Sequence, residues 1–460
     1  MAVPARSRGA TAIRAKRSFL ARQVLLPAQA VIHSRVVSGV VLFAAAVVAL
    51  IAANSPWSEA YAAFRETEIS IDLPFVSLSL NLKHWVNDGL MTVFFFVVGL
   101  EIKRELLHGE LNAWEKAALP FFAALGGMVV PALVYLAFNW DGPGRSGWGI
   151  PMATDIAFAL GVLALLGERI PSQLRVFLLA LATVDDIGAI LVIAIFYTSS
   201  LSFQALGWAA GLLGAVLAMR WIGIRGVHYY AVVGAGFWLA LQQTGVHPTI
   251  AGVLLGLATP ADPWFGYREF ASHARELVSR FEKELQRCDE ARADALLGHL
   301  EELARETEAP LERLERLVQP WVSFIILPLF ALVNAGIELS AGTIASAAVS
   351  PIAQGCAAGL LLGKFGGIWI SCWGAIRFGA GRLPTGVALR HVAGVALIAG
   401  IGFTVALFIT GLAFQGEEAQ AAKLGILVAS IIAGLSGWAA LRFQGELDAT
   451  MNSRKLSART

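Results

Sequence analysis

Two adjacent aspartates, Asp185 and Asp186, lie within Leu178–Tyr197, a stretch that is otherwise almost wholly apolar and long enough to cross a bilayer. Asp155 and Lys364 lie in two further apolar segments. Each ionised group costs about 2.5–3.5 kcal/mol at the bilayer centre, so the four together cost about 10–14 kcal/mol, as much as the net stability of an ordinary domain. Because three acids outnumber one base, a proton or a bound cation must supply the missing positive charge. These residues predict a transport site for cations or protons.

The two neighbouring aspartates cannot both face the same partner, because adjacent residues on a helix point about 100° apart. We expect one to face a cation cavity and the other to turn toward Lys364, the only lysine that we place deep inside a span. Around Lys364 glycine recurs at every fourth position, a spacing that lets another helix approach closely. The repeat consists of Gly355, Gly359, Gly363 and Gly367. Packing explains these glycines but not the lysine, so we expect Lys364 to be functional.

Two apolar segments carry helix-breaking residues at their centres. Asp155 follows Pro151 and Thr154, and a second segment contains Gly400-Ile-Gly-Phe-Thr404. Such residues favour broken helices, whose freed N-termini carry partial positive charge and whose C-termini carry partial negative charge. We expect Asp155 to neutralise facing N-termini and Lys364 to neutralise facing C-termini. The hydroxyls of Thr154 and Thr404 either offer oxygen ligands or, as is commoner, bond to a carbonyl of their own helix.

The composition is that of an integral membrane protein, and the apolar runs of about 20 residues given below predict an all-α fold. Hydrophobic residues make up 57% of the chain, charged residues 15%, and the mean hydropathy is +0.66, whereas soluble domains have about 25% charged residues. We expect membrane lipid as a partner. The net charge of +2 is too small to suggest a nucleic-acid partner, and Cys288, Cys356 and Cys372 lack metal-ligand spacing. We therefore expect no cofactor and propose no disulfide framework.

Twelve apolar segments are candidate transmembrane helices. They are 36–53, 88–106, 117–138, 148–167, 173–197, 203–220, 227–243, 246–259, 320–337, 350–372, 386–413 and 420–441. Lys and Arg gather in alternate loops, and the opposite, outer set contains only Arg65, Lys83, Arg145 and Lys423. The positive-inside rule then places both termini in the cytoplasm. The predicted parts are an N-terminal tail at 1–35, a transmembrane domain at 36–441 and a C-terminal tail at 442–460.

Two connecting loops are unusually long. Residues 54–84, outside, contain two short alternating runs, Glu68–Asp72 and Val76–Leu80, separated by Pro74, which predicts a β-hairpin. Residues 261–318, inside, are highly charged with Leu and Phe at helical spacing. That pattern predicts an amphipathic helical hairpin on the cytoplasmic surface; a separate catalytic or coiled-coil domain is the alternative.

Several motifs, in order over roughly residues 36–440, resemble those of the NhaA family of sodium/proton antiporters. They are Asn87-Asp-Gly-Leu-Met, Phe95-Phe-Val-Val-Gly-Leu-Glu-Ile-Lys-Arg-Glu, Ala153-Thr-Asp-Ile-Ala-Phe, Ala182-Thr-Val-Asp-Asp-Ile-Gly-Ala, Gly245-Val-His, Gln319-Pro-Trp, Ile326-Leu-Pro-Leu-Phe-Ala, Val333-Asn-Ala-Gly, Gly363-Lys-Phe and Gly400-Ile-Gly-Phe-Thr. The resemblance implies two inverted repeats with two discontinuous helices that cross at mid-membrane, an architecture for which this family is itself a known example. It also implies a homodimer in the cell inner membrane, with the β-hairpin pairing between copies.

The resemblance further assigns roles to individual residues. Asp185 and Asp186 would exchange sodium or lithium for protons in the service of pH and sodium homeostasis, with Asp185 pairing Lys364 in one state. Thr154 and Asp155 would sit at the helix crossing. The pH response would rest on a further set at the cytoplasmic mouth and elsewhere: Glu101, Arg104, Glu105, Glu315 and His247. For His247 the alternative is a histidine that merely occupies a helix N-terminus beside Pro248.

One departure concerns pH. Many members of the family have histidines at the positions of Arg316 and Gln319, and neither residue present here titrates near neutral pH. The pH set-point implied by the family is therefore in doubt, whereas the transport chemistry is not.

Two other functions could use membrane carboxylates. An intramembrane aspartyl protease needs two acids that share a proton across a gap, whereas Asp185 and Asp186 on one helix face apart, and no Gly-x-Gly-Asp motif occurs. A passive cation channel would need no lysine competing for the acid. We therefore expect an antiporter, not an enzyme, in which cations and protons compete for the same carboxylates.

Overall fold

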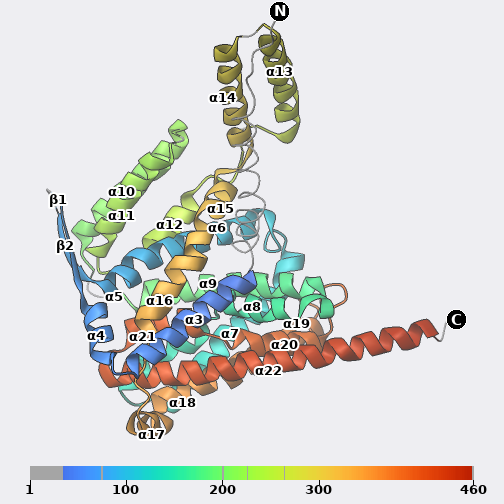
Figure 1. Ribbon diagram of the computed structural model, residues 1–460. Coiled ribbons are helices and arrows are strands. Elements are labelled where there is room, and N and C mark those ends of the chain that lie inside the picture. The colour runs from blue at the N-terminus through green and yellow to red at the C-terminus, as the bar shows by residue number, and fades with distance from the viewer. Residues whose placement is uncertain are drawn as a thin grey trace, which may run out of the picture.

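The computed structural model describes residues 35–73, 76–198, 201–224, 226–263, 265–287 and 289–457. The predicted N-terminal tail and the Pro74 turn therefore lie almost wholly outside the described residues. The described chain is predominantly helical, and its strands form one two-stranded sheet (Figure 1). This confirms the predicted helical class.

Eight helices of the described chain are long and apolar enough to cross a membrane. They are α3 (Arg35–Ala53), the run from α5 (Leu82–His84) to α6 (Met91–His108), α7 (Trp114–Asn139), α9 (Ser172–Phe196), α10 (Phe203–Ile222), the run from α15 (Pro310–Trp321) to α16 (Leu327–Asn334), the run from α18 (Pro351–Ala358) to α19 (Lys364–Arg377), and α22 (Gly416–Ser457). The protein is thus a multi-pass membrane protein.

Two further pairs of helices satisfy the same criteria only when each pair counts as one bent span. The short helical segment Pro143–Met152 meets α8 (Ile156–Leu165) at 42°, and α20 (Leu389–Ala399) meets α21 (Phe403–Ala413) at 46°. The described chain therefore has up to ten spans. Both breaks fall where proline and glycine interrupt apolar segments, which confirms that 148–167 and 386–413 are discontinuous.

The remaining two predicted spans correspond to shorter helices, α11 (Val227–Gln242) and α12 (Ile250–Ala258), which do not reach spanning length. Helix α12 nevertheless lies very close to α6. A Cβ atom added at Gly256 would lie 2.6 Å from the Phe96 carbonyl oxygen, and one at Gly252 would lie 2.1 Å from that of Thr92. Only glycine permits this separation of the two backbones.

The glycine repeat around Lys364 also serves close packing, as predicted. A Cβ atom at Gly363 would lie 2.6 Å from the Cα atom of Pro131, and one at Gly367 would lie 2.1 Å from the carbonyl oxygen of Gly126, both on α7. A π-helical turn at Gly359–Gly363 immediately precedes Lys364. Two other π-helical turns occur at Trp85–Leu90 and Val322–Ile326. No local pattern in the sequence predicts these turns.

The β-hairpin prediction is confirmed. Strands β1 (Glu68–Leu73) and β2 (Val76–Asn81) pair antiparallel, with Glu68 opposite Asn81 and Leu73 opposite Val76. Helix α17 (Ala341–Val349) lies at the bottom of Figure 1, next to α18, whereas α4 (Ser58–Glu66) leads directly into the hairpin. We refer to this region as the β-hairpin end.

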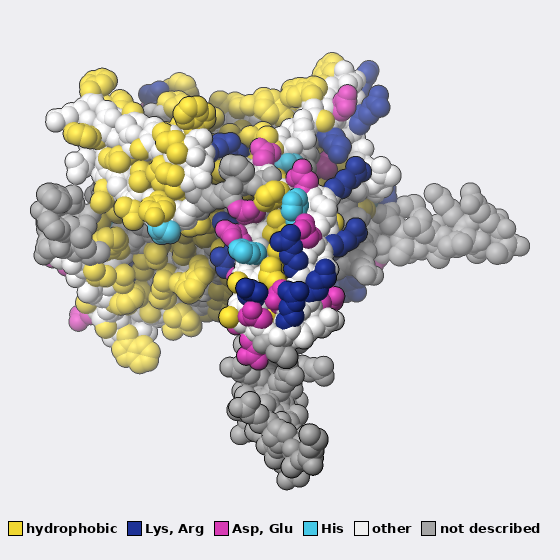
Figure 2. Space-filling model, turned by 90° about the horizontal axis from the view of Figure 1, so that it is seen from above, with side chains coloured by type: hydrophobic (Ala, Val, Ile, Leu, Met, Phe, Trp, Pro, Cys, Tyr) yellow, Lys and Arg dark blue, Asp and Glu magenta, His cyan; other side chains and the backbone are white. Residues whose placement is uncertain are grey.

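The predicted helical hairpin is also present. Helices α13 (Tyr267–Gln286) and α14 (Glu290–Thr307) pack together and project from the top of the molecule in Figure 1, the α13–α14 end. Figure 2 shows their basic, acidic and histidine side chains gathered beside a largely hydrophobic surface. The base of the hairpin is closed, because Phe265 N donates to Glu306 O at 3.4 Å and Leu311 N donates to Pro260 O at 3.1 Å.

Candidate functional site

The Asp155 carboxylate lies where the two helix breaks meet. Its Oδ1 atom accepts a hydrogen bond of 3.0 Å from Phe158 N, at the start of α8. Its Oδ2 atom accepts bonds from the backbone N of Thr404 at 3.0 Å and from the Thr404 hydroxyl at 2.6 Å, at the start of α21. One buried carboxylate thus neutralises the N-termini of both half-helices, which is the arrangement expected from the sequence.

Two different residues cap the facing C-termini. The Lys364 ammonium donates to Met152 O at the end of Pro143–Met152, whereas the Thr154 hydroxyl donates to Ala399 O at the end of α20 at 3.0 Å. Lys364 thus contacts one of the two C-termini that it is expected to neutralise, and Thr154 contacts the other. Neither Thr154 nor Thr404 uses its hydroxyl to bond its own helix, because both reach across to the other broken helix.

The adjacent aspartates have different surroundings. Asp185 is 1% exposed, and its Oδ2 atom lies 2.7 Å from the Nζ atom of Lys364, which is fully buried. Asp186 lines a cavity, whereas Asp185 is not among the residues that line it. The division between a lysine partner and a cavity is the one predicted from the helical angle between neighbouring residues.

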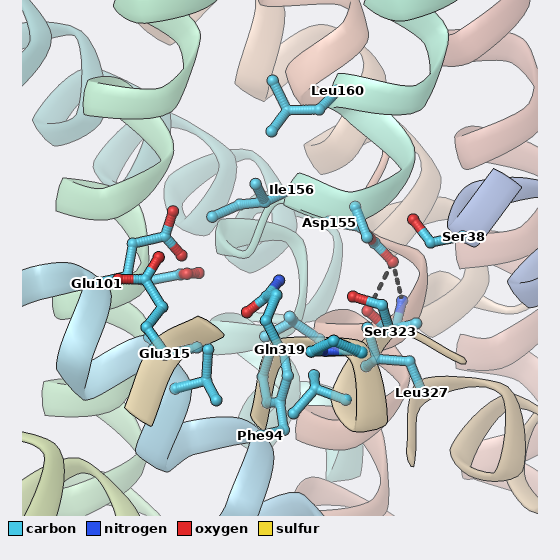
Figure 3. A pocket seen from close by; sticks show the side chains of 18 of the residues that line it. Ser38, Phe94, Glu101, Asp155, Ile156, Leu160, Glu315, Gln319, Ser323 and Leu327 are labelled. Carbon is cyan, nitrogen blue, oxygen red and sulfur yellow. Dashed lines mark hydrogen bonds between the residues drawn. The ribbon is translucent and has the colours of Figure 1, made fainter. Parts of the chain in front are cut away.

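The cavity has a volume of about 430 Å³ and contains acidic, basic and apolar side chains. Figure 3 shows Glu101 and Glu315 on one side of it and Asp155 on the other, with Gln319 between them. Residues of α6, α15 and α16 form one wall, and residues of the first helix break with α8, of α9 and of α21 form the opposite wall. Ser38 of α3 lies beside Asp155 (Figure 3). Asp186 and Asp155 both line this cavity.

Three of the predicted pH-linked residues, Glu101, Arg104 and Glu315, line this cavity, and a fourth, Glu105, contacts Arg104. The Arg104 guanidinium lies 3.7 Å from Glu101 Oε1 and 3.6 Å from Glu105 Oε1, and it donates to the carboxylate of Glu315. Helices α6 and α15 therefore share one arginine among three carboxylates. Removing a proton from, or adding one to, any of these acids changes the attraction between the two helices.

His247 does not belong to that cluster. Its Nε2 atom lies 3.6 Å from Asp88 Oδ1, its Nδ1 atom lies 2.7 Å from the Thr249 hydroxyl, and it does not line the cavity. Its carbonyl accepts a hydrogen bond from Ile250 N at the start of α12, so His247 occupies a helix N-terminus. The structure therefore separates His247 from the other predicted pH-linked residues.

The two positions that depart from the family pattern line the cavity. Arg316 and Gln319 lie on its α15 wall, and Arg316 makes two contacts with the Glu308 carboxylate, at 2.6 and 2.8 Å. Glu308 stands between α14 and α15. This ion pair connects α15, which lines the cavity, to the segment between α14 and α15 at the base of the helical hairpin.

Lys423 was assigned to an outer loop, and this assignment is wrong. It is buried within α22, and its ammonium donates to Asn334 O, at the end of α16, at 2.8 Å. The Asn334 side chain in turn donates to Asn87 Oδ1 at 2.7 Å. The sequence does not mark this burial, because Lys423 stands near the start of its apolar run.

The fold and the site define a class of protein. Two broken helices meet around a buried carboxylate, beside a lysine–aspartate pair and a cavity, inside a multi-pass helical protein. This is the arrangement of a secondary transporter, in which half-helix ends surround the transported ion.

Comparison with known sequences identifies the family. The family described as Na+/H+ antiporter 1 matches residues 29–441. The chain is 46% identical over 446 residues to the Na(+)/H(+) antiporter NhaA 2 of Sorangium cellulosum, covering 95% of each chain. It is 46% identical over 431 residues to the NhaA antiporter of Syntrophobacter fumaroxidans, covering 92% and 91% of the two chains. The chain belongs to this Na+/H+ antiporter family, which confirms the resemblance and identifies a transporter, not an enzyme.

Proposed function

We propose that the protein exchanges sodium, or lithium, for protons across the cell inner membrane. The observation that carries the proposal is the contrast between the two aspartates: Asp185 is paired with Lys364, whereas Asp186 faces the cavity. The family membership and the printed names of the relatives support the same exchange.

In this mechanism protons and cations compete for the same carboxylates. A cation that enters the cavity meets Asp186, and its positive charge can take over from the Lys364 ammonium as the partner of Asp185. A proton on the same carboxylates removes the charge that attracts the cation. Because either ligand satisfies the acids, the loaded site is nearly neutral, and it can be exposed alternately to the two sides of the membrane.

The supporting architecture is part of the proposal. Counting α11 and α12 together with the eight straight and two bent spans gives twelve crossings, arranged as two inverted repeats whose broken helices cross at mid-membrane. Both termini then lie in the cytoplasm, as does the α13–α14 hairpin, and 36–441 is the transmembrane domain. The β-hairpin pairs with a second copy, so deleting 66–82 should convert a homodimer into monomers by size-exclusion chromatography.

The cluster around Arg104 is proposed to carry part of the pH response. Protonation of Glu101, Glu105 or Glu315 leaves the arginine with fewer negative partners and weakens the contact between α6 and α15. That contact lies beside the cavity, so its strength should affect how readily the two walls move.

The proposal is tested with purified protein in proteoliposomes. Addition of sodium or lithium should drive protons in the opposite direction, and the sodium flux should follow an imposed proton gradient of either sign. Potassium serves as the comparison cation. A sodium flux that is unchanged by the opposing proton gradient would instead identify a passive channel.

A further inference from the structure

The cavity lies between two groups of helices that must move relative to each other. Its α15 wall includes Glu312 and Glu315, close to the base of the helical hairpin, so the walls are apart toward the α13–α14 end. Alternating access requires that the walls meet on one side of the site while they part on the other. The β-hairpin end must therefore contain the contacts that close the site.

One part of that closure is aromatic. Phe408 lies one helical turn beyond Thr404 on α21, and its ring centroid is 5.4 Å from that of Phe95 on α6 and 6.3 Å from that of Phe330 on α16. The His247 ring lies 5.2 Å from the same ring. All three phenylalanines are buried. Helices from both walls thus meet in an apolar layer that excludes water.

The second part is a single polar contact across the walls. Lys423 lies on α22, which packs on α20 and α21, whereas Asn334 ends α16 on the opposite wall. The buried Lys423 ammonium donates to Asn334 O at 2.8 Å, where the C-terminus of α16 carries partial negative charge. Through its side chain Asn334 is also bonded to Asn87, so the end of α16 and the start of the α6 span form one unit.

Going beyond the proposed exchange function, on which the inference rests, we propose that Lys423 is a positioning residue that holds the two walls together at the β-hairpin end. The contact between its ammonium and Asn334 O forms when the site opens toward the α13–α14 end and is released when the site opens toward the β-hairpin end. A charge–dipole contact suits this role because water can replace either partner once the walls part. An apolar side chain at this position would lack the hydrogen bond to Asn334 O.

The first test measures access to the site from each side. A single cysteine, Ser323→Cys, is placed on the cavity wall after Cys288, Cys356 and Cys372 are changed to alanine, and a membrane-impermeant maleimide is applied to oriented vesicles. Lys423→Met should increase labelling from the β-hairpin side about fivefold or more and decrease labelling from the other side. Lys423→Arg, which keeps the charge, should label as the unmodified Lys423 protein does. Equal labelling of Lys423→Met and its parent from both sides would overturn the proposal.

The second test does not depend on the folding of a Lys423 variant. Leu339 and Glu417 are exposed; Leu339 follows the end of α16, and Glu417 lies in the first turn of α22, one to two turns before Lys423. Spin labels at Leu339→Cys and Glu417→Cys should show two distances between the labels, a shorter one for the closed contact and a longer one for the released contact. The fraction of molecules with the longer distance should change when sodium or pH changes. One unchanging separation would refute the release of this contact. Both tests report structure and not flux, so they can fail while sodium-driven proton movement remains intact.

Discussion

The helix-break site and the α13–α14 hairpin are both rich in charge, yet their charges are satisfied in opposite ways. At the site, Lys364 pairs with Asp185 and Thr404 with Asp155, which are partners far apart in the sequence, and these side chains are buried. In the hairpin, Arg280 pairs with Glu276 and Arg305 with Glu301 on the same helix, four residues apart, and these side chains are about 60–67% exposed.

This contrast separates charges that perform chemistry from charges that keep a helix soluble. An exposed pair four residues apart adds about 0.3–0.5 kcal/mol, because water already solvates both partners. Breaking a buried pair by removing one partner costs about 3–5 kcal/mol, because the other charge is left without a partner in a medium that cannot solvate it. We therefore expect substitutions in the two regions to differ about tenfold in effect on stability and more in effect on transport.

The largest expected effect is that of Asp186→Asn. The amide keeps the shape of the side chain but carries neither the negative charge nor the exchangeable proton, so sodium-driven proton movement should disappear. The variant should remain monodisperse, because Asp186 lies at the cavity and makes no contact as close as that of Asp185 with Lys364. Exchange at the wild-type rate by this folded variant in proteoliposomes would show that Asp186 is not an exchange carboxylate.

Lys364→Ala should have the largest effect on stability. Removing the ammonium leaves the buried Asp185 carboxylate unpaired and Met152 O without its donor, and we expect a loss of about 3–5 kcal/mol. Adding Asp185→Asn should restore part of this loss. Thermal unfolding of the four proteins in a double-mutant cycle measures the coupling, and strictly additive losses would contradict a direct pair.

The double substitution Arg316→His with Gln319→His should change the pH profile without changing the maximal rate. Both side chains line the cavity near its α15 end, so they can affect wall movement without contacting Asp185 or Asp186. Two groups that titrate near neutral pH should steepen or displace the activation curve. Rates measured from pH 6 to pH 9, with Arg316→Lys as the charge-preserving control, test this, and superimposable profiles would exclude these positions from pH sensing.

The smallest effect is expected for Arg280→Ala in the helical hairpin. Its partner Glu276 is on the same helix and both side chains are exposed, so the loss should be about 0.5 kcal/mol or less, with unchanged transport. Thermal unfolding and the proteoliposome assay measure the two quantities. A loss as large as that of Lys364→Ala would remove the distinction between the two regions.

The sequence revealed the site because membrane carboxylates are costly, and Asp155, Asp185, Asp186 and Lys364 stand out for that reason. The breaks were predictable from proline and glycine at the centres of apolar segments. Of the two roles open to Thr154 and Thr404, the bond to a carbonyl of their own helix does not occur, because a break brings carbonyls and carboxylates of another segment within reach. The role as oxygen ligands stays a prediction.

Other features depend on contacts that no local pattern encodes. Lys423 looked like a loop residue because it stands near the start of its apolar run, and only the position of Asn334 explains its burial. The π-helical turn before Lys364 accommodates one extra residue among close-packed glycines, and no residue type marks such a turn. His247 belongs to a motif of the family, but its distance from the cavity depends on where α12 packs.

The closed base of the helical hairpin has a practical consequence for imaging. Backbone hydrogen bonds join Leu311 to Pro260 and Phe265 to Glu306 at this base. The chain therefore leaves and re-enters the transmembrane part at adjacent points. A rigid protein inserted between Gln286 and Glu290 would extend from two paired helices without separating the segments at their base. A 48.9 kDa protein that lies mostly within a detergent belt offers few features for particle alignment. Such an insertion would supply a fiducial mark outside the belt, at a defined distance from the transport cavity.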